Sequence, residues 1–136
     1  MSRYLLDTNI ASHIIKGDDA AMIARLTQIP MNEVAISVVT EAELRYGVAK
    51  RGHPAGLAAR VREFLIRVEV LPWTREEANV YGDLRASCEA AGITLAPLDM
   101  MIAAHAKAVD AVLVTRDRAF SRIPGKLPQE GWMNKA

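Results

Sequence analysis

Short apolar runs alternate with longer helical patterns along this chain. Four runs have the length of a strand: YLL at 4–6, VAIS at 34–37, VEVL at 68–71 and AVLVT at 111–115. Between them, apolar residues recur at helical spacing over 9–16, 19–28, 38–50, 54–68, 74–92 and 99–108. Strands that alternate with helices need crossover connections. The pattern therefore predicts an α/β fold with a mainly parallel sheet of four to five strands and helices on both faces.

Capping residues mark two of the predicted helix starts. Ser37 precedes the helix over 38–50 as an N-cap, and Thr74 with Glu77 forms a T-x-x-E capping box. Residues 126–136 are predicted to form an irregular tail with one short edge strand. Because the 136 residues contain no linker, repeat or change of composition, we expect a single domain over 1–136.

Composition excludes several classes of protein. Apolar residues make up 51% and charged residues 24% of the chain, a balance typical of globular proteins. No apolar run approaches the roughly 18 residues of a membrane span, and no secretory signal is visible. Cys88 is the single cysteine, which excludes an internal disulfide and a cysteine zinc site. We expect a soluble cytoplasmic protein.

Charge is unevenly distributed although the net charge is only +1. Residues 45–67 carry six basic side chains against Glu63, and residues 115–126 carry four against Asp117. Residues 69–99 carry six acids and two arginines. Basic segments beside an acidic centre suit a polyanion whose phosphates lie near a cation. Charge alone favours the simpler alternative of solvated helix faces.

Three aspartates stand where parallel sheets place their sites. Asp7 follows the first strand directly and Asp117 lies two residues past the fourth, so both belong to the carboxyl edge of the sheet. Asp99 shares a helix face with the apolar Ile102 and Ala103, which predicts that its carboxylate points inward. Each aspartate alone is explained by a turn or an N-cap. A group of them favours a functional site.

The helix over 38–50 offers a glutamate to the same edge. Periodicity does not choose between Glu41 and Glu43, which lie about 160° apart around the axis; the space beside Gly47 favours Glu43 weakly. The same periodicity gives this helix an apolar face that we expect to meet the core, formed by Val38, Val39, Ala42, Tyr46 and Ala49. Leu44 and Val48 form a second apolar patch opposite, which suits a dimer or antitoxin surface or, equally, a helix buried on both sides.

An all-carboxylate cluster is typical of a site for a hard cation. Asp7, one of the two glutamates, Asp99 and Asp117 have no histidine or cysteine at ligand spacing, which favours Mg²⁺ or Mn²⁺ with several bound waters. Such a site can supply a nucleophilic water and stabilise charge on a phosphate. Metal-dependent hydrolysis of phosphodiesters fits this chemistry best.

Four motifs in order resemble one known family. LLDTN, SVVTEAELRYG, PLDMMIAAHA and VTRDRAF resemble the PIN-domain nucleases, specifically the VapC-type toxins of bacterial toxin–antitoxin systems, over residues 3–127. The resemblance implies the following acidic site: Asp7, Glu43, Asp99 and Asp117. It implies that Asp117 acts through water and that polar residues support the acids: Thr8, Asn9 and Thr115.

The resemblance also implies an activity and partners. The chain would be an Mg²⁺- or Mn²⁺-dependent endoribonuclease, usually a homodimer, with Arg45, Arg116 and Arg118 as candidate contacts to RNA phosphates. A cognate antitoxin would insert a C-terminal segment into the acidic groove. That antitoxin would also carry the DNA-binding domain, so this chain would meet DNA only indirectly.

Two other functions remain open at this point. One is a catalytically weak member of the same fold that serves as a protein-binding module. The other is an aspartate-based phosphate-transfer domain with Asp7 as acceptor, which Asn9 disfavours because a second aspartate is expected there. We predict packing or surface roles for His13, His53 and His105.

Overall fold

The computed structural model of the protein describes residues 3–133. Five strands form one sheet in the order β3-β2-β1-β4-β5, and every neighbouring pair is parallel. The strands are β1 (Tyr4–Leu6), β2 (Val34–Ser37), β3 (Glu69–Leu71), β4 (Val112–Val114) and β5 (Gln129–Glu130). The predicted α/β class is therefore confirmed.

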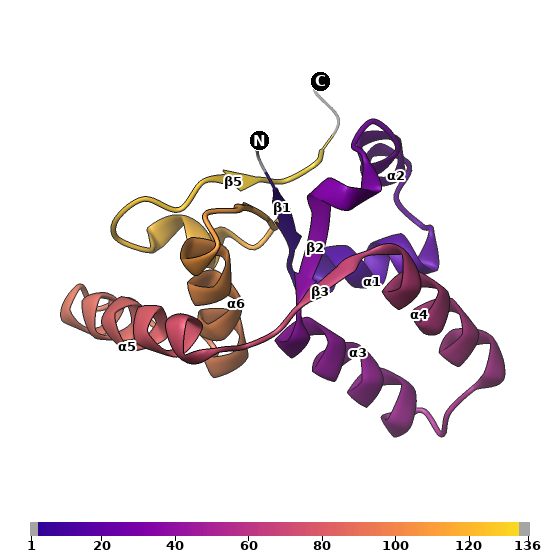
Figure 1. Ribbon diagram of the computed structural model, residues 1–136, viewed down its shortest axis with the longest axis horizontal. Coiled ribbons are helices and arrows are strands. Elements are labelled where there is room, and N and C mark those ends of the chain that lie inside the picture. Colours follow the sequence, from indigo (N-terminus) through magenta and orange to yellow (C-terminus); the bar gives the residue numbers. More distant parts are fainter. Residues whose placement is uncertain (1–2, 134–136) are drawn as a thin grey trace.

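Six α-helices connect and cover the strands (Figure 1). They are α1 (Thr8–Lys16), α2 (Ala20–Thr27), α3 (Val38–Lys50), α4 (Ala55–Arg67), α5 (Arg75–Ala90) and α6 (Pro97–Ala108), with 3₁₀ turns η1 (Met31–Glu33) and η2 (Arg118–Arg122). Ser37 caps α3 by accepting a hydrogen bond from the Val39 amide, and the Thr74–Glu77 capping box is present. Both predicted caps are confirmed.

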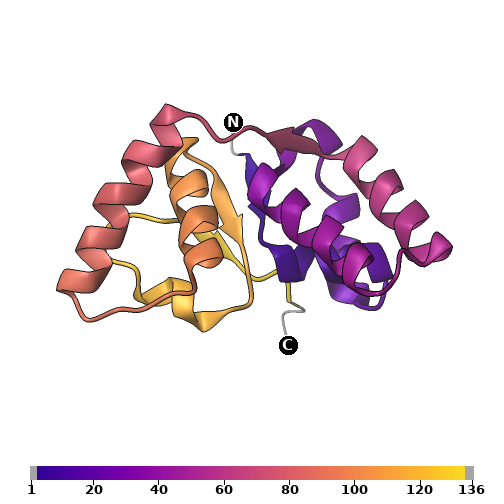
Figure 2. The ribbon, with the colours of Figure 1, turned by 90° about the horizontal axis from the view of Figure 1, so that it is seen from below.

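Alternation along the short strands separates two cores. Leu5, Ala35 and Leu113 point to the face covered by α5 and α6. Their neighbours Leu6 and Val114 point to the opposite face, covered by α1, α2 and α4. Figure 2 shows the α5–α6 pair on one side of the sheet and α1 to α4 on the other. Helices on both faces explain why the central strands β1, β2 and β4 are almost wholly apolar.

The predicted core face of α3 is wrong. Val38, Ala42, Tyr46 and Ala49 are exposed, with Tyr46 at 66%, and of the five predicted residues Val39 alone is buried. The buried side chains of α3 include Leu44 and Val48, which join the core beneath α1 and α4. The helix carries two apolar stripes, and tertiary packing rather than periodicity selects which of them faces the core.

The C-terminal segment contains the predicted edge strand. β5 pairs with β4, and Trp132 packs edge-on against Tyr4 with ring centroids 5.9 Å apart. Residues 134–136 of the predicted tail lie outside the described residues. Between residues 3 and 133, no helix has both the length and the apolar character that crossing a bilayer requires.

Candidate functional site

The direction of the chain connections changes between β1 and β4. From β1 the chain proceeds outward to β2 and β3 and then returns to place β4 on the other side of β1. The amide of Asp7 donates to the Val114 carbonyl across this boundary, at 3.0 Å. In open parallel sheets such a switch point leaves a crevice at the carboxyl ends of the strands, where ligands bind.

Asp7 is held rigidly at this point. Its side chain is 4% exposed and caps α1, where Oδ1 accepts from the Ile10 amide at 2.8 Å. Oδ2 accepts from the Thr115 hydroxyl at 2.5 Å, and Thr115 lies directly after β4. Because both oxygens are engaged by rigid elements, the carboxylate has a fixed orientation.

Glu43 is oriented by a pair of threonines. The Thr8 hydroxyl donates to Glu43 Oε1 at 2.6 Å and lies 3.2 Å from the hydroxyl of Thr40. Thr40 is fully buried and was missed by the reasoning from sequence. Its position one turn before Glu43 on the same helix was the available signal.

Asp99 and Asp117 complete the group. Asp99 lies half-buried in the first turn of α6. Asp117 is exposed and caps η2 by accepting from the Ala119 amide at 2.9 Å. The Asp117 amide donates to the Thr115 hydroxyl at 3.1 Å, so this one threonine links the backbone of Asp117 to the carboxylate of Asp7.

The four carboxylates influence one another electrostatically. Burial raises the pKa of Asp7, and the charges of Asp117 and Glu43 raise it further, against the lowering effect of its hydrogen bonds. Burial also raises the pKa of Asp99, with added repulsion from Glu43, Asp117 and Asp7. Like charges concentrated in one crevice favour a cation there.

The donor set at this crevice consists of oxygen alone, which suits a hard divalent cation. Among residues 3–133, no hydrogen bond engages Oε2 of Glu43 or either side-chain oxygen of Asp99. Within the same described range, no three acidic, histidine or cysteine side chains already stand at the spacing of a closed metal site. The oxygen donors of these residues suit such a cation, but their side chains are not at the spacing of a closed metal site.

Some predicted supporting residues lie apart from the acids or engage other groups. Asn9 is exposed, and its side chain makes no hydrogen bond with the residues that the structure describes. Glu41 faces away from the crevice and accepts a hydrogen bond from Arg45 at 2.7 Å within α3. Arg118 is exposed beside Asp117.

Arg116 turns away from the crevice toward the start of α2. Its guanidinium pairs with Asp19 at 2.5 Å and donates to the carbonyls of Gly131 and Trp132 at 2.8 Å each. This pairing lowers the pKa of Asp19. In this structure Arg116 joins β4 to α2 and the C-terminal segment rather than facing a phosphate.

His105 lies in the core and bridges two elements. It is fully buried on α6, and its Nδ1 lies 2.7 Å from the Ser37 hydroxyl at the start of α3. Its Nε2 has no hydrogen-bond partner among the described residues, and Trp73 packs edge-on against the ring. This histidine therefore connects the two helices that carry Asp99 and Glu43.

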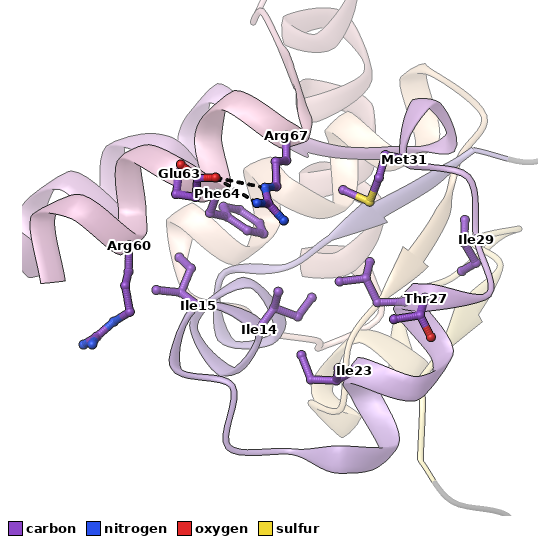
Figure 3. Close-up of a pocket in the computed structure, with 11 residues that line it drawn as sticks. Ile14, Ile15, Ile23, Thr27, Ile29, Met31, Arg60, Glu63, Phe64 and Arg67 are labelled. Atoms are coloured by element: carbon purple, nitrogen blue, oxygen red, sulfur yellow. Dashed lines mark hydrogen bonds and ion pairs between the residues drawn. The ribbon is translucent and has the colours of Figure 1, made fainter. Parts of the chain in front are cut away.

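An apolar cavity of about 570 Å³ opens beyond α1, on the helical layer formed with α2 and α4. Isoleucines of α1 and α2, among them Ile14, Ile15 and Ile23, face Phe64 of α4 across it (Figure 3). Arg60 and the Glu63–Arg67 ion pair stand at its margin (Figure 3). The lining suits apolar side chains bordered by charge.

Comparison with known proteins gives consistent matches over the whole chain. The profile of the PIN domain family matches residues 4–126. Ribonuclease VapC2 of Haemophilus influenzae is 32% identical over 134 residues, covering 98% of this chain and 100% of that protein. The tRNA(fMet)-specific endonuclease VapC of Shigella flexneri is 35% identical over 133 residues, covering 97% and 99%.

Solved structures of VapBC proteins share this fold. DNA-bound VapBC from Salmonella typhimurium superposes with a TM-score of 0.90 at 35% identity, covering 98% of this chain and all of the matched chain. VapBC2 from Rickettsia felis, bound to a DNA fragment from its promoter, gives a TM-score of 0.86 at 34% identity, covering 93% and 96%.

Proposed function

Because this chain belongs to the PIN-domain family, we propose that it is the endoribonuclease toxin of a toxin–antitoxin pair, which hydrolyses RNA at a divalent cation held by its acids. One observation carries the proposal: Asp7 is buried and rigidly oriented at the switch point of the sheet, and the charges of Glu43 and Asp117 act on both Asp7 and Asp99. Its relatives in Haemophilus influenzae and Shigella flexneri are named as a ribonuclease and an endonuclease.

In this proposal Asp7, Glu43 and Asp99 hold Mg²⁺ or Mn²⁺, and the more exposed Asp117 acts through water. The bound cation supplies Lewis acidity toward the phosphate and lowers the pKa of its water. Thr115 fixes Asp7, and Thr8 with Thr40 fixes Glu43, so the carboxylates need little reorganisation.

The antitoxin would use the apolar cavity between α1, α2 and α4. The related solved structures from Salmonella and Rickettsia are VapBC complexes, which supports a protein partner for this chain. An apolar helix of the antitoxin fits the isoleucine-lined cavity, and its following C-terminal segment would enter the acidic crevice. DNA would then be bound through the antitoxin.

A homodimer is the proposed assembly. The exposed apolar stripe of α3, which contains Val38, Ala42 and Tyr46, lies on the helix that carries Glu43. Leu98, 44% exposed, stands next to Asp99 in sequence. These apolar side chains are exposed and lie close in sequence to Glu43 and Asp99, which supports an interface near the crevice.

Substitution of the acids tests the catalytic proposal. Asp7→Asn and Asp99→Asn should each lower the rate of RNA cleavage at least about 100-fold, since each removes a charged ligand, and should weaken Mn²⁺ binding measured by calorimetry. Asn still caps helices well, so Asp7→Asn should retain the fold by circular dichroism. Asp83→Asn, on the exposed surface of α5, is the matched control.

Either active-site variant cleaving at the wild-type rate would overturn the site. Induced expression in bacteria should arrest growth and create discrete RNA ends, and co-expression of the adjacent small gene should restore growth. A purified protein that binds this partner but neither Mn²⁺ nor RNA would instead favour a protein-binding module.

A further inference from the structure

A second, smaller cavity adjoins the acidic crevice. It has a volume of about 140 Å³ and lies between α1, α3 and α4. Thr8 and Glu43 form one wall, so the hydrogen-bonded pair that orients the acid also borders this cavity. The floor is apolar and includes the buried side chains of Leu44 and Val48.

Two cations stand at the cavity on the side away from the acids. Lys16 ends α1 and Arg51 caps the end of α3; both are exposed, and neither forms an ion pair with residues 3–133. Arg51 Nη1 donates to the Gly47 carbonyl at 3.0 Å, which holds the guanidinium against the last turn of α3. By contrast, Arg45 is already paired with an acid.

Gly47 keeps the space between Glu43 and Arg51 open. It lies one turn after Glu43 on the cavity wall. A Cβ added there would meet a single atom within 4 Å, the flexible Arg51 Nη1 at 3.5 Å. A larger side chain at this position would therefore enter the cavity without disturbing the backbone.

We propose that this cavity is a subsite for the RNA nucleotide next to the scissile phosphate, with Lys16 and Arg51 binding its phosphate. The inference rests on the proposed ribonuclease function. Each RNA phosphate carries a negative charge that the four carboxylates repel, and the two cations, about two helical turns past Thr8 and Glu43, offset this repulsion. Ser12, which lies on α1 between Thr8 and Lys16, also lines the cavity and adds a hydroxyl donor.

The size of the cavity indicates the form of the RNA. A volume of 140 Å³ corresponds to about five water molecules. This is room for part of one nucleotide and excludes the backbone of a duplex. The subsite therefore favours a single-stranded or unstacked nucleotide at the cleavage position.

Binding of a labelled, mixed-sequence single-stranded RNA of 20 nucleotides, measured by fluorescence anisotropy with Ca²⁺ in place of Mg²⁺, tests the subsite. Lys16→Gln and Arg51→Gln should each weaken binding about tenfold. Each should also reduce the slope of log Kd against log salt by about 0.7, the value for one lost phosphate contact on a single strand. Lys50→Gln is the control, because Lys50 adjoins Arg51 in sequence but stacks over Tyr46 outside the cavity.

Gly47→Val provides an independent variant that keeps every charge. It should lower RNA affinity and cleavage by filling the cavity, while Mn²⁺ affinity stays at the wild-type value. If all three cavity variants bind RNA as the Lys50→Gln control does while the wild type cleaves RNA, the subsite is wrong and the ribonuclease proposal stands. A wild-type protein that neither binds nor cleaves RNA would overturn both.

Discussion

At the scale of single residues, the site depends on hydroxyl groups as much as on acids. Thr115 reaches Asp7 across 108 positions of sequence, and Thr8 reaches Glu43 across 35. Asp7 and Asp117 were predicted because strand ends are visible as the ends of apolar runs, whereas Asp99 followed from its helix face and Glu43 from the family resemblance. It did not predict Thr40, since a threonine inside a helix carries no sign that its hydroxyl meets another element.

Distant ion pairs were also invisible in the sequence. Arg116 was a candidate for RNA contact because of its place in the VTRDRAF motif of the family resemblance, yet in the structure it pairs with Asp19, 97 positions away. No local pattern records such a pairing, because it depends on how β4 and α2 are packed. Lys16 and Arg51, which line the cavity bordered by Thr8 and Glu43, form no ion pair with residues 3–133.

His105 should make stability fall on mild acidification. Burial lowers its pKa from 6.5, against a weaker opposing effect of Glu77. Between the pKa of His105 in the folded state and 6.5, the unfolded chain binds more protons than the folded protein. The free energy of unfolding therefore has its full value above pH 6.5 and falls as the pH decreases below it. The loss is at most roughly 1.4 kcal/mol per pH unit within that window.

Urea unfolding of the wild type and of His105→Gln at several values between pH 5 and 7.5 measures this effect. The wild type should lose more free energy of unfolding than the variant, whose side chain does not titrate. Equal pH dependence of the two proteins would mean that the pKa of His105 is the same in the folded and the unfolded state.

At the scale of elements, α3 shows the limit of periodicity. The sequence located its start at Ser37 and its length correctly, because capping and helix spacing are local properties. It assigned the core to the stripe that includes Ala42 and Tyr46, whereas Leu44 and Val48 are buried. A helix packed between the sheet edge and α4 offers two apolar faces, and local sequence does not rank them.

Two helix caps should have different functional effects. Ser37→Ala removes the buried cap of α3 and the partner of His105, and should cost about 2–3 kcal/mol of stability. RNA cleavage should also fall, because α3 carries Glu43. Thr74→Ala removes the exposed cap of α5 and should cost about 1 kcal/mol with cleavage unchanged.

Urea titration and initial cleavage rates, measured at a temperature where both variants are folded, distinguish these expectations. Unaltered cleavage by folded Ser37→Ala would mean that the start of α3 tolerates loss of its connection to α6.

At the scale of the whole molecule, the parallel direction of the strands made the acidic crevice predictable. Parallel strands bring their carboxyl ends to one edge, and so Asp7 and Asp117 were expected together before any contact was known. The order itself, with β1 between β2 and β4, was beyond the sequence pattern. That order creates the switch point at which Asp7 lies.

The exposed stripe of α3 should control assembly. Tyr46→Asp places a charge on an apolar surface that is 66% exposed and should convert the proposed dimer to a monomer in light scattering. Ile66→Asp, on α4 and 74% exposed, is the control and should leave the molecular mass unchanged. A dimer that survives the Tyr46 substitution would place the interface elsewhere.

The central position of β1 has a consequence for synthesis of the protein. The ribosome makes Asp7 more than a hundred residues before the Val114 carbonyl and the Thr115 hydroxyl that hold it. Chains grow from the N-terminus and fold as they emerge. An unfinished copy that stops before β4 therefore lacks the contacts that hold Asp7, and the crevice forms only after β4 and Thr115 have been made.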